Sequence, residues 1–150
     1  NIFLGYDYTS SEEDIAYDLL CLFGLDYLAN NKRSLLDMEV GEKGKRLSGG
    51  QSKRLALVRS IMGRADVLLW DDPFSSVDVI LEKQIIEKLK TMDVLINKTI
   101  ILSTHRLTTV RFCENYFHIG KDVGVIEDGK ISEGLLQGHE VYEYFKQQMV

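Results

Sequence analysis

The chain has 150 residues, 45% hydrophobic and 27% charged, which is ordinary for a globular domain with a core of its own. Its net charge of −5 argues against a general binder of nucleic acids or of anionic membranes. Cys21 and Cys113 have neither metal-site nor disulfide-framework spacing, so we expect two reduced, buried thiols. No apolar run in the sequence approaches the ~20 residues that a membrane span requires.

The first part of the chain predicts helices joined by loops. Residues 10–14 combine hydroxyl caps with acidic side chains, which is typical of a helix start, and Gly24 is expected to end that helix. Tyr27 and Leu28 indicate a short second helix. Residues 31–46 are polar and interrupted by glycines, so we expect a loop there.

Residues 47–51, Leu-Ser-Gly-Gly-Gln, predict a short loop that opens an amphipathic helix, and Gly63 is expected to end that helix in the left-handed conformation. Ser48 is a natural N-cap, and Gly49 and Gly50 leave the backbone open to a ligand. Because free N–H groups at a helix N-terminus bind anions, the pattern favours a phosphate site. On these five residues alone, an ordinary capped helix after a glycine turn fits equally well.

From residue 66 onward, strands and helices alternate, which predicts a largely parallel α/β sheet. The apolar runs at 67–70 and 99–103 predict buried strands, and residues 116–119 predict a weaker one. A last amphipathic helix is expected to bury Val141 and Phe145.

Polar side chains stand where the predicted strands end. Asp71 and Asp72 follow the first strand, and a turn is expected at 75–78. His105 follows the second strand. In open α/β sheets, ligands bind at these ends, where one carboxylate suits Mg²⁺, a second suits a base that orients water, and a histidine can donate to a phosphate. Taken singly, Asp72 could cap the turn at Pro73 and His105 could be structural, but together these residues favour a nucleotide site.

In order and spacing, four segments resemble the signature, Walker B, D-loop and H-loop motifs of an ABC transporter ATPase: 47–51, 67–72, 75–78 and 103–105. The resemblance covers practically the whole chain. It implies an α/β fold with a partial P-loop NTPase-like parallel sheet and the ABC helical subdomain at its N-terminal side. We therefore expect a helical subdomain at 1–62, ending in the signature helix, and the C-terminal part of the RecA-like ATPase core at 63–150.

The resemblance gives roles to the residues at the strand ends. Asp71 would contribute to Mg²⁺ coordination, mostly through water, and Asp72 stands at the position of the general base. His105 would contact the γ-phosphate of ATP. ATP and Mg²⁺ are therefore the implied cofactors.

Further roles fall on an interface between two nucleotide-binding domains, which are either identical or different. The signature residues would bind the γ-phosphate of ATP held by the facing subunit: Ser48, Gly49, Gly50 and Gln51. Asp78 would communicate across that dimer. Residues 39–44 are similar to the loop that exporter-type members place against the coupling helices of the membrane domain, with a plain surface turn as the alternative. The resemblance thus implies a second nucleotide-binding domain and a transmembrane domain as partners, no nucleic acid, and a location at the cytoplasmic side of a membrane.

The family's P-loop, Gly-x-x-x-x-Gly-Lys-[Ser/Thr], is absent from this sequence. Asn1 and Ile2 resemble the end of a longer segment that follows the family's glutamine loop. We therefore expect a fragment of a nucleotide-binding domain, and we expect the isolated chain to be inactive.

One partial match to the P-loop lies at 124–131, with the glycines and the lysine but without the Ser or Thr. Asp128-Gly129 within it predicts a hairpin turn between strands at 123–127 and 130–132. A P-loop needs a turn from a strand into a helix, so we expect this match to be fortuitous.

Asp72 stands where the family most often has glutamate. An aspartate is one methylene shorter, would hold the attacking water less well, and would lower hydrolysis more than binding. An intact signature beside this aspartate resembles the degenerate-side member of a heterodimeric exporter. Residues 71–78 also resemble the first nucleotide domain of C-type transporters, which share that asymmetry.

The leading function is therefore an ATPase that drives export through a membrane domain. A second class is a non-transport ABC ATPase acting on DNA or ribosomes, but the acidic charge and the lack of a basic stripe argue against it. A third is a non-catalytic ATP-binding regulatory module, for which Asp72 is the only indication in the sequence.

Overall fold

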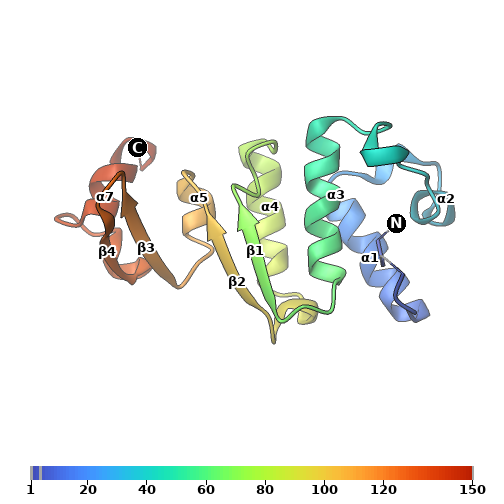
Figure 1. The fold of residues 1–150 in the computed structure, drawn as a ribbon, viewed down its shortest axis with the longest axis horizontal. Coiled ribbons are helices and arrows are strands. Elements are labelled where there is room, and N and C mark those ends of the chain that lie inside the picture. The colour runs from blue at the N-terminus through green and yellow to red at the C-terminus, as the bar shows by residue number, and fades with distance from the viewer. Residues whose placement is uncertain (1, 4, 150) are drawn as a thin grey trace. The chain divides into compact units, whose positions relative to one another are not determined.

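A computed structural model of the chain describes residues 2, 3 and 5–149, so Asn1, which belongs to the expected start of the fragment, lies outside the described residues. The chain forms two compact units, Asn1–Ser103 (unit 1) and Thr104–Val150 (unit 2), and each is described by itself. The first is built of helices and a parallel strand pair, and the second of a β-hairpin and short helices (Figure 1).

Unit 1 begins with α1, Ser10–Leu22, which confirms the first predicted helix. Its N-cap is Thr9, one residue before the predicted start, and Glu12 completes a reciprocal cap with it. Gly24 follows the helix end in the left-handed conformation, with φ of 61°. The expected short second helix is the 3₁₀ turn η1, Asp26–Leu28.

The prediction of a plain loop at 31–46 was wrong. The segment contains α2, Lys32–Leu36, and the 3₁₀ turn η2, Glu42–Gly44. The side chain of Asn31 accepts from Ser34 N, and Ser34 in turn accepts from Asn31 N, so local capping starts a helix that has too few apolar residues to be recognised by periodicity.

The signature helix α3 covers Gly49–Met62, with Ser48 as its N-cap, as predicted. The prediction of a left-handed stop at Gly63 was wrong, because Gly63 has φ of −64° and ψ of 157°. Gly63 N still donates to Arg59 O, and the extended backbone carries the chain directly toward the next strand.

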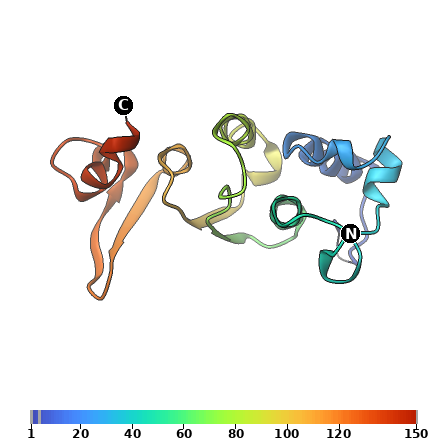
Figure 2. The ribbon, with the colours of Figure 1, turned by 90° about the horizontal axis from the view of Figure 1, so that it is seen from above.

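Two parallel strands follow, β1 (Val67–Asp71) and β2 (Thr99–Ser103), paired in register from Val67↔Thr99 to Asp71↔Ser103. Between them lie α4 (Val79–Leu89) and the 3₁₀ turn η3 (Asp93–Leu95), so the predicted strand–helix–strand unit is confirmed. In Figure 1, α3 and α4 run alongside β1, and Figure 2 shows both helices end-on.

The expectation that both strands are buried was wrong for this chain. Leu68 and Trp70 are buried, and Trp70 Nε1 donates to Ser60 Oγ of α3 at 2.9 Å, whereas Leu69 is 74% exposed. Successive side chains of a strand point to opposite faces. In the described part of the chain β1 and β2 pair only with each other, and one face of the pair carries exposed apolar side chains.

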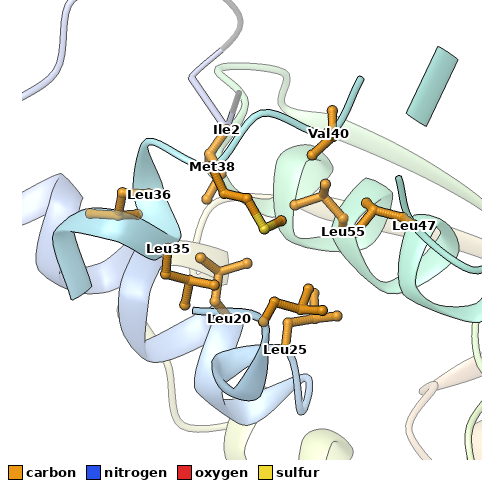
Figure 3. Close-up of a pocket in the computed structure, with 10 residues that line it drawn as sticks. Ile2, Leu20, Leu25, Leu35, Leu36, Met38, Val40, Leu47 and Leu55 are labelled. Atoms are coloured by element: carbon orange, nitrogen blue, oxygen red, sulfur yellow. The ribbon is translucent and has the colours of Figure 1, made fainter. Parts of the chain in front are cut away.

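A small apolar cavity of about 20 Å³ lies among the N-terminal helices of unit 1. Its lining is aliphatic apart from Met38, and it includes Leu47 and Leu55, which flank the start of the signature helix (Figure 3). A cavity of this size and polarity holds no more than one water molecule and offers it no hydrogen-bond partners. It belongs to the packing of the helices rather than to a binding site.

Unit 2 is built on an antiparallel hairpin of β3 (Asn115–Gly120) and β4 (Gly124–Lys130), seen as a long ribbon in Figure 2. Its short helices are, in chain order, α5 (Leu107–Val110), α6 (Ile131–Gly134), α7 (Glu140–Phe145) and the 3₁₀ turn η4 (Lys146–Gln148). Leu107, Val141 and Phe145 form its core. The sheet is therefore parallel only in unit 1, and the predicted last helix is confirmed.

The hairpin turn was predicted at the wrong place. It lies at 121–123, where Asp122 has φ of 63°, and Gly124 follows with φ of 81°. Asp128 and Gly129 instead lie inside β4, and Gly129 leaves room for the ring of Tyr116 at 3.6 Å from an added Cβ. Both Asp-containing segments carry turn residues, so local turn rules do not distinguish between them.

Cys21 and Cys113 form no disulfide with each other, and both are half-buried rather than buried as expected. Among the described residues, none of the helices has both the length and the apolar character that crossing a membrane demands.

Candidate functional site

The N-terminus of α3 is held by a reciprocal cap between two signature residues. Gln51 N donates to Ser48 Oγ at 3.2 Å, and Ser48 N donates to Gln51 Oε1 at 2.6 Å. Both side chains that the sequence assigned to phosphate binding are thus engaged in shaping the helix start. The capping fixes the direction of the backbone N–H groups that lie between them.

Gly49 and Gly50 are the first two residues of α3, so their N–H groups have no acceptor within the helix. No other acceptor contacts these two groups in the part of the chain that the structure describes. A Cβ added at Gly49 would meet nothing within 4 Å, and one at Gly50 would lie 3.5 Å from Ser76 Cβ. Glycine costs a helix about 0.5–1 kcal/mol relative to alanine, and local packing gives no reason to accept that cost at Gly49. The open backbone fits a phosphate group.

Two side-chain contacts connect this helix start to segments far away in the sequence. Gln51 Nε2 donates to Tyr27 Oη of η1 at 2.7 Å. Lys53 Nζ donates to Ser75 Oγ at 2.9 Å, in the turn that follows β1. The sequence predicted a short helix at Tyr27 but not its contact with Gln51, and it predicted no contact for Lys53, because no local rule pairs residues this distant.

The turn at 75–78 packs against the signature helix within unit 1. Ser76 is the residue that a Cβ on Gly50 would contact, and Ser75 holds Lys53. Asp78 is the N-cap of α4, and its Oδ1 accepts from Ile80 N at 3.0 Å and from Leu81 N at 2.9 Å. The structure therefore brings the predicted signature and D-loop residues together on one surface.

Asp71 is the last residue of β1, and its Oδ1 accepts from Ser103 Oγ at 2.5 Å, at the end of β2. The described residues contain no group of three or more His, Cys, Asp or Glu side chains that could hold a metal ion by themselves. Mg²⁺ is usually bound by one or two carboxylates together with waters and substrate phosphates. The exposed carboxylate of Asp71 fits that kind of shared site and does not form a cage of protein ligands.

Asp72 has a backbone conformation that is unusual for a residue other than glycine, with φ of 41°. Its N–H donates to Ser103 O at 3.0 Å, and its carbonyl accepts from Ser75 N at 3.2 Å. Asp72 therefore turns the chain sharply out of β1 and starts the turn toward α4. Strained backbone of this kind concentrates at functional sites, and Asp is among the residues that tolerate it best.

His105 lies in unit 2 and is exposed, two residues before α5. Its carbonyl accepts from Gln148 Nε2 at 3.1 Å, and Gln148 Oε1 accepts from Leu107 N at 3.0 Å. The C-terminal segment thereby fixes the backbone on both sides of Arg106. This contact, over more than 40 residues, was not predicted from the sequence.

The loop at 39–44 is shaped by glycines and by one ion pair. Gly41 and Gly44 have φ of 75° and 72°. Arg46 Nη1 lies 3.3 Å from Glu39 Oε2, and Arg46 N donates to Val40 O at 3.1 Å. The exposed loop is therefore closed on itself within unit 1.

The segment 124–131, which partly matches a P-loop, forms β4 and the first residue of α6. Its middle lies in an antiparallel ladder in which His118 pairs with Glu127. The glycine-rich turn that would surround a phosphate is not present in this segment, so the match is fortuitous, as predicted.

Comparisons with known proteins show what this chain is similar to. The family model described as ABC transporter matches residues 12–75, a range that contains the signature and both Asp71 and Asp72. The chain is also similar to a solved structure of a bacterial Atm1-family ABC exporter with ATP bound, with a TM-score of 0.75 and 26% sequence identity. The match covers 98% of this chain and 25% of the exporter chain.

Two curated relatives carry the names of transport proteins. The chain is 32% identical to an ATP-dependent lipid A-core flippase of Methylobacillus flagellatus, and the match covers 98% of this chain and 25% of the flippase. It is 34% identical to the mitochondrial iron-sulfur clusters transporter ABCB7 of Homo sapiens, over 93% of this chain and 18% of that protein. The chain thus spans a quarter or less of the length of these relatives. By its motifs, its fold and these similarities, the chain belongs to the ABC transporter family, as part of an exporter-type ATP-binding domain.

Proposed function

We propose that this chain supplies the signature face of an ABC exporter's nucleotide-binding domain, and that this face binds the γ-phosphate of an ATP molecule held by a second such domain. The observation that carries the proposal is the pair of open N–H groups at Gly49 and Gly50, on a helix start capped by Ser48 and Gln51. The packing of Gly50 beside Ser76 makes the 75–78 turn part of the same face.

Asp71, Asp72 and His105 would serve a nucleotide in the same domain, with Asp71 contributing to Mg²⁺ coordination through water. Asp72 would orient the attacking water as the general base, and His105 would contact the γ-phosphate. Asp71 would help to hold Mg²⁺, and the ion's positive charge would offset the negative charge of the phosphates. This sequence has no P-loop to hold that ATP, so we expect no turnover from the 150-residue chain alone.

The aspartate at position 72 supports a narrower proposal, in which the domain is the degenerate-side member of a heterodimer. Its own site would then bind ATP and hydrolyse it slowly, while its signature completes the active site of the other subunit. A regulatory module that binds ATP without hydrolysis is the second candidate, and the same short side chain at Asp72 is the observation that favours it.

The similarity to exporters supports a transmembrane domain as the other partner, with the chain at the cytoplasmic side of a membrane and the loop at 39–44 as the contact. Under this proposal residues 1–62 are the helical subdomain and residues 63–150 belong to the RecA-like core.

The test is ATP turnover by the full-length exporter that we propose, with Gly49→Asp. An added Cβ meets no atom within 4 Å, and an acidic residue in the first turn favours a helix, so stability should be unchanged or raised. The carboxylate should repel phosphate and lower turnover at least ten-fold. Ala56→Asp, two turns further along the exposed side of α3, is the control and should keep turnover near that of the wild type. Unchanged turnover in Gly49→Asp would contradict the proposal.

A further inference from the structure

Tyr27 occupies an unusual place beside the signature helix. It lies in the 3₁₀ turn Asp26–Leu28, which contains no buried residue, and it is itself 65% exposed. Nevertheless its hydroxyl lies 2.7 Å from Gln51 Nε2, so a residue outside every described motif contacts the last signature residue across 24 positions.

The direction of this hydrogen bond follows from the chemistry of its neighbours. The backbone N–H of Ser48 can only donate, so the Gln51 atom at 2.6 Å from it must be the amide oxygen. The other end of the amide is then the NH₂ group, which donates to the Tyr27 oxygen. The Ser48 N–H therefore selects the orientation of the Gln51 amide, and the Tyr27 hydroxyl holds the other end of the amide in place.

The selected orientation matters for the two glycines between Ser48 and Gln51. With Tyr27 holding Nε2, the amide oxygen stays on Ser48 N–H and completes the cap. An amide released from Tyr27 could rotate, and its oxygen could then accept from Gly49 or Gly50, whose N–H groups are open. Such rotation would occupy the donors that phosphate requires.

We propose that Tyr27 is a positioning residue for the signature helix, which fixes the Gln51 amide so that the Gly49 and Gly50 N–H groups remain available to phosphate. The inference rests on the function proposed above and adds a residue that acts only through Gln51. Tyr27 does not need to touch the nucleotide for this role.

The experiment compares Tyr27→Phe with the wild type in the full-length exporter. The variant keeps the exposed ring and removes only the hydroxyl. Losing one hydrogen bond should lower kcat/KM for ATP about three- to ten-fold, while the melting temperature stays within about 2 °C. Tyr8→Phe is the matched control, because the Tyr8 ring stacks on Phe3 and its hydroxyl makes no hydrogen bond in the described residues, and it should leave kcat/KM unchanged.

A double-mutant cycle separates positioning from a general structural effect. In a Gln51→Ala background, Tyr27→Phe should have no further effect on kcat/KM. Equal losses in both backgrounds, or no loss in either, would overturn the role of Tyr27. These outcomes leave the proposed function intact as long as Gly49→Asp lowers turnover at least ten-fold, whereas a fully active Gly49→Asp variant counts against the proposed function itself.

Discussion

Lys53 Nζ donates a hydrogen bond to Ser75 Oγ at 2.9 Å, and this contact joins the second turn of the signature helix to the turn that precedes α4. Both residues are exposed, so the bond contributes little to folding. Its consequence is geometric, because it keeps the 75–78 turn beside the open N–H groups of Gly49 and Gly50. Two segments that would face the same partner nucleotide are thus held together within one chain.

Removing either end of this contact should affect turnover more than stability. Lys53→Met and Ser75→Ala in the full-length protein should each lower ATP turnover about two- to five-fold, and the double variant should lose no more than either single one. The free energy of unfolding should change by less than about 1 kcal/mol in each. Steady-state turnover and urea titrations check this, and losses that multiply in the double variant would show that the two residues act independently.

Asp72→Glu should separate catalysis from backbone strain. The longer carboxylate should hold water better and raise turnover on the order of ten-fold in the full-length protein. The backbone at φ of 41° suits aspartate better than glutamate, so the same variant should lower the free energy of unfolding by about 1 kcal/mol or less. Asp72→Asn, which tolerates this backbone and cannot act as a base, is the control. Unchanged turnover in Asp72→Glu would remove the support for a degenerate site.

Asp78→Ala should destabilise unit 1 by about 1 kcal/mol, because the carboxylate caps two backbone N–H groups of α4. Asp78→Ser retains a capping oxygen and should recover most of that loss. Chemical denaturation of the 150-residue chain measures both variants. If the serine variant is as unstable as the alanine variant, the capping contact does not explain the effect.

Unit 2 should become less stable in acid through Glu127. Its carboxylate lies 2.5 Å from His139 Nδ1 and accepts from Val141 N at 3.2 Å, at the start of α7. The hydrogen bond with His139 is the main cause that holds the pKa of Glu127 below its usual value of 4.5. A lowered folded-state pKa means that the ionised form stabilises the fold above pH 4.5, and that this contribution is lost as pH falls below it.

Glu127→Gln tests this contribution directly. The wild type should melt at a higher temperature than the variant at about pH 5, and the difference should shrink as pH falls toward about 3. Asp128→Asn, at an exposed neighbouring position, should show no such pH-dependent difference. If the difference in melting temperature stays constant over this range, Glu127 stabilises unit 2 through packing and not through its charge.

The features that were predicted correctly are those that local rules determine. Ser48 caps α3 through a residue three positions away, and β1 follows from a short apolar run. The same kind of rule could have found α2, since Asn31 and Ser34 form an equally local cap, but the few apolar residues gave no periodicity.

The features that were missed depend on residues distant in the sequence. Tyr27 meets Gln51, and Lys53 meets Ser75, only because helices pack in one particular way. The exposed side chain of Leu69 shows the same dependence, because an apolar strand is buried on both faces only if both faces are covered. The positive φ of Asp72 has no sequence signal apart from the tolerance of aspartate for it.

Mixed dimers of the full-length protein test most directly whether the signature acts on the facing subunit's ATP. One population carries Gly49→Asp and keeps its P-loop, and the other has its P-loop lysine replaced and keeps Gly49. Each should be inactive alone, and mixing them should restore turnover, because one composite site in the mixed dimer has an intact P-loop and an intact signature. A mixture as inactive as its two components would contradict the account.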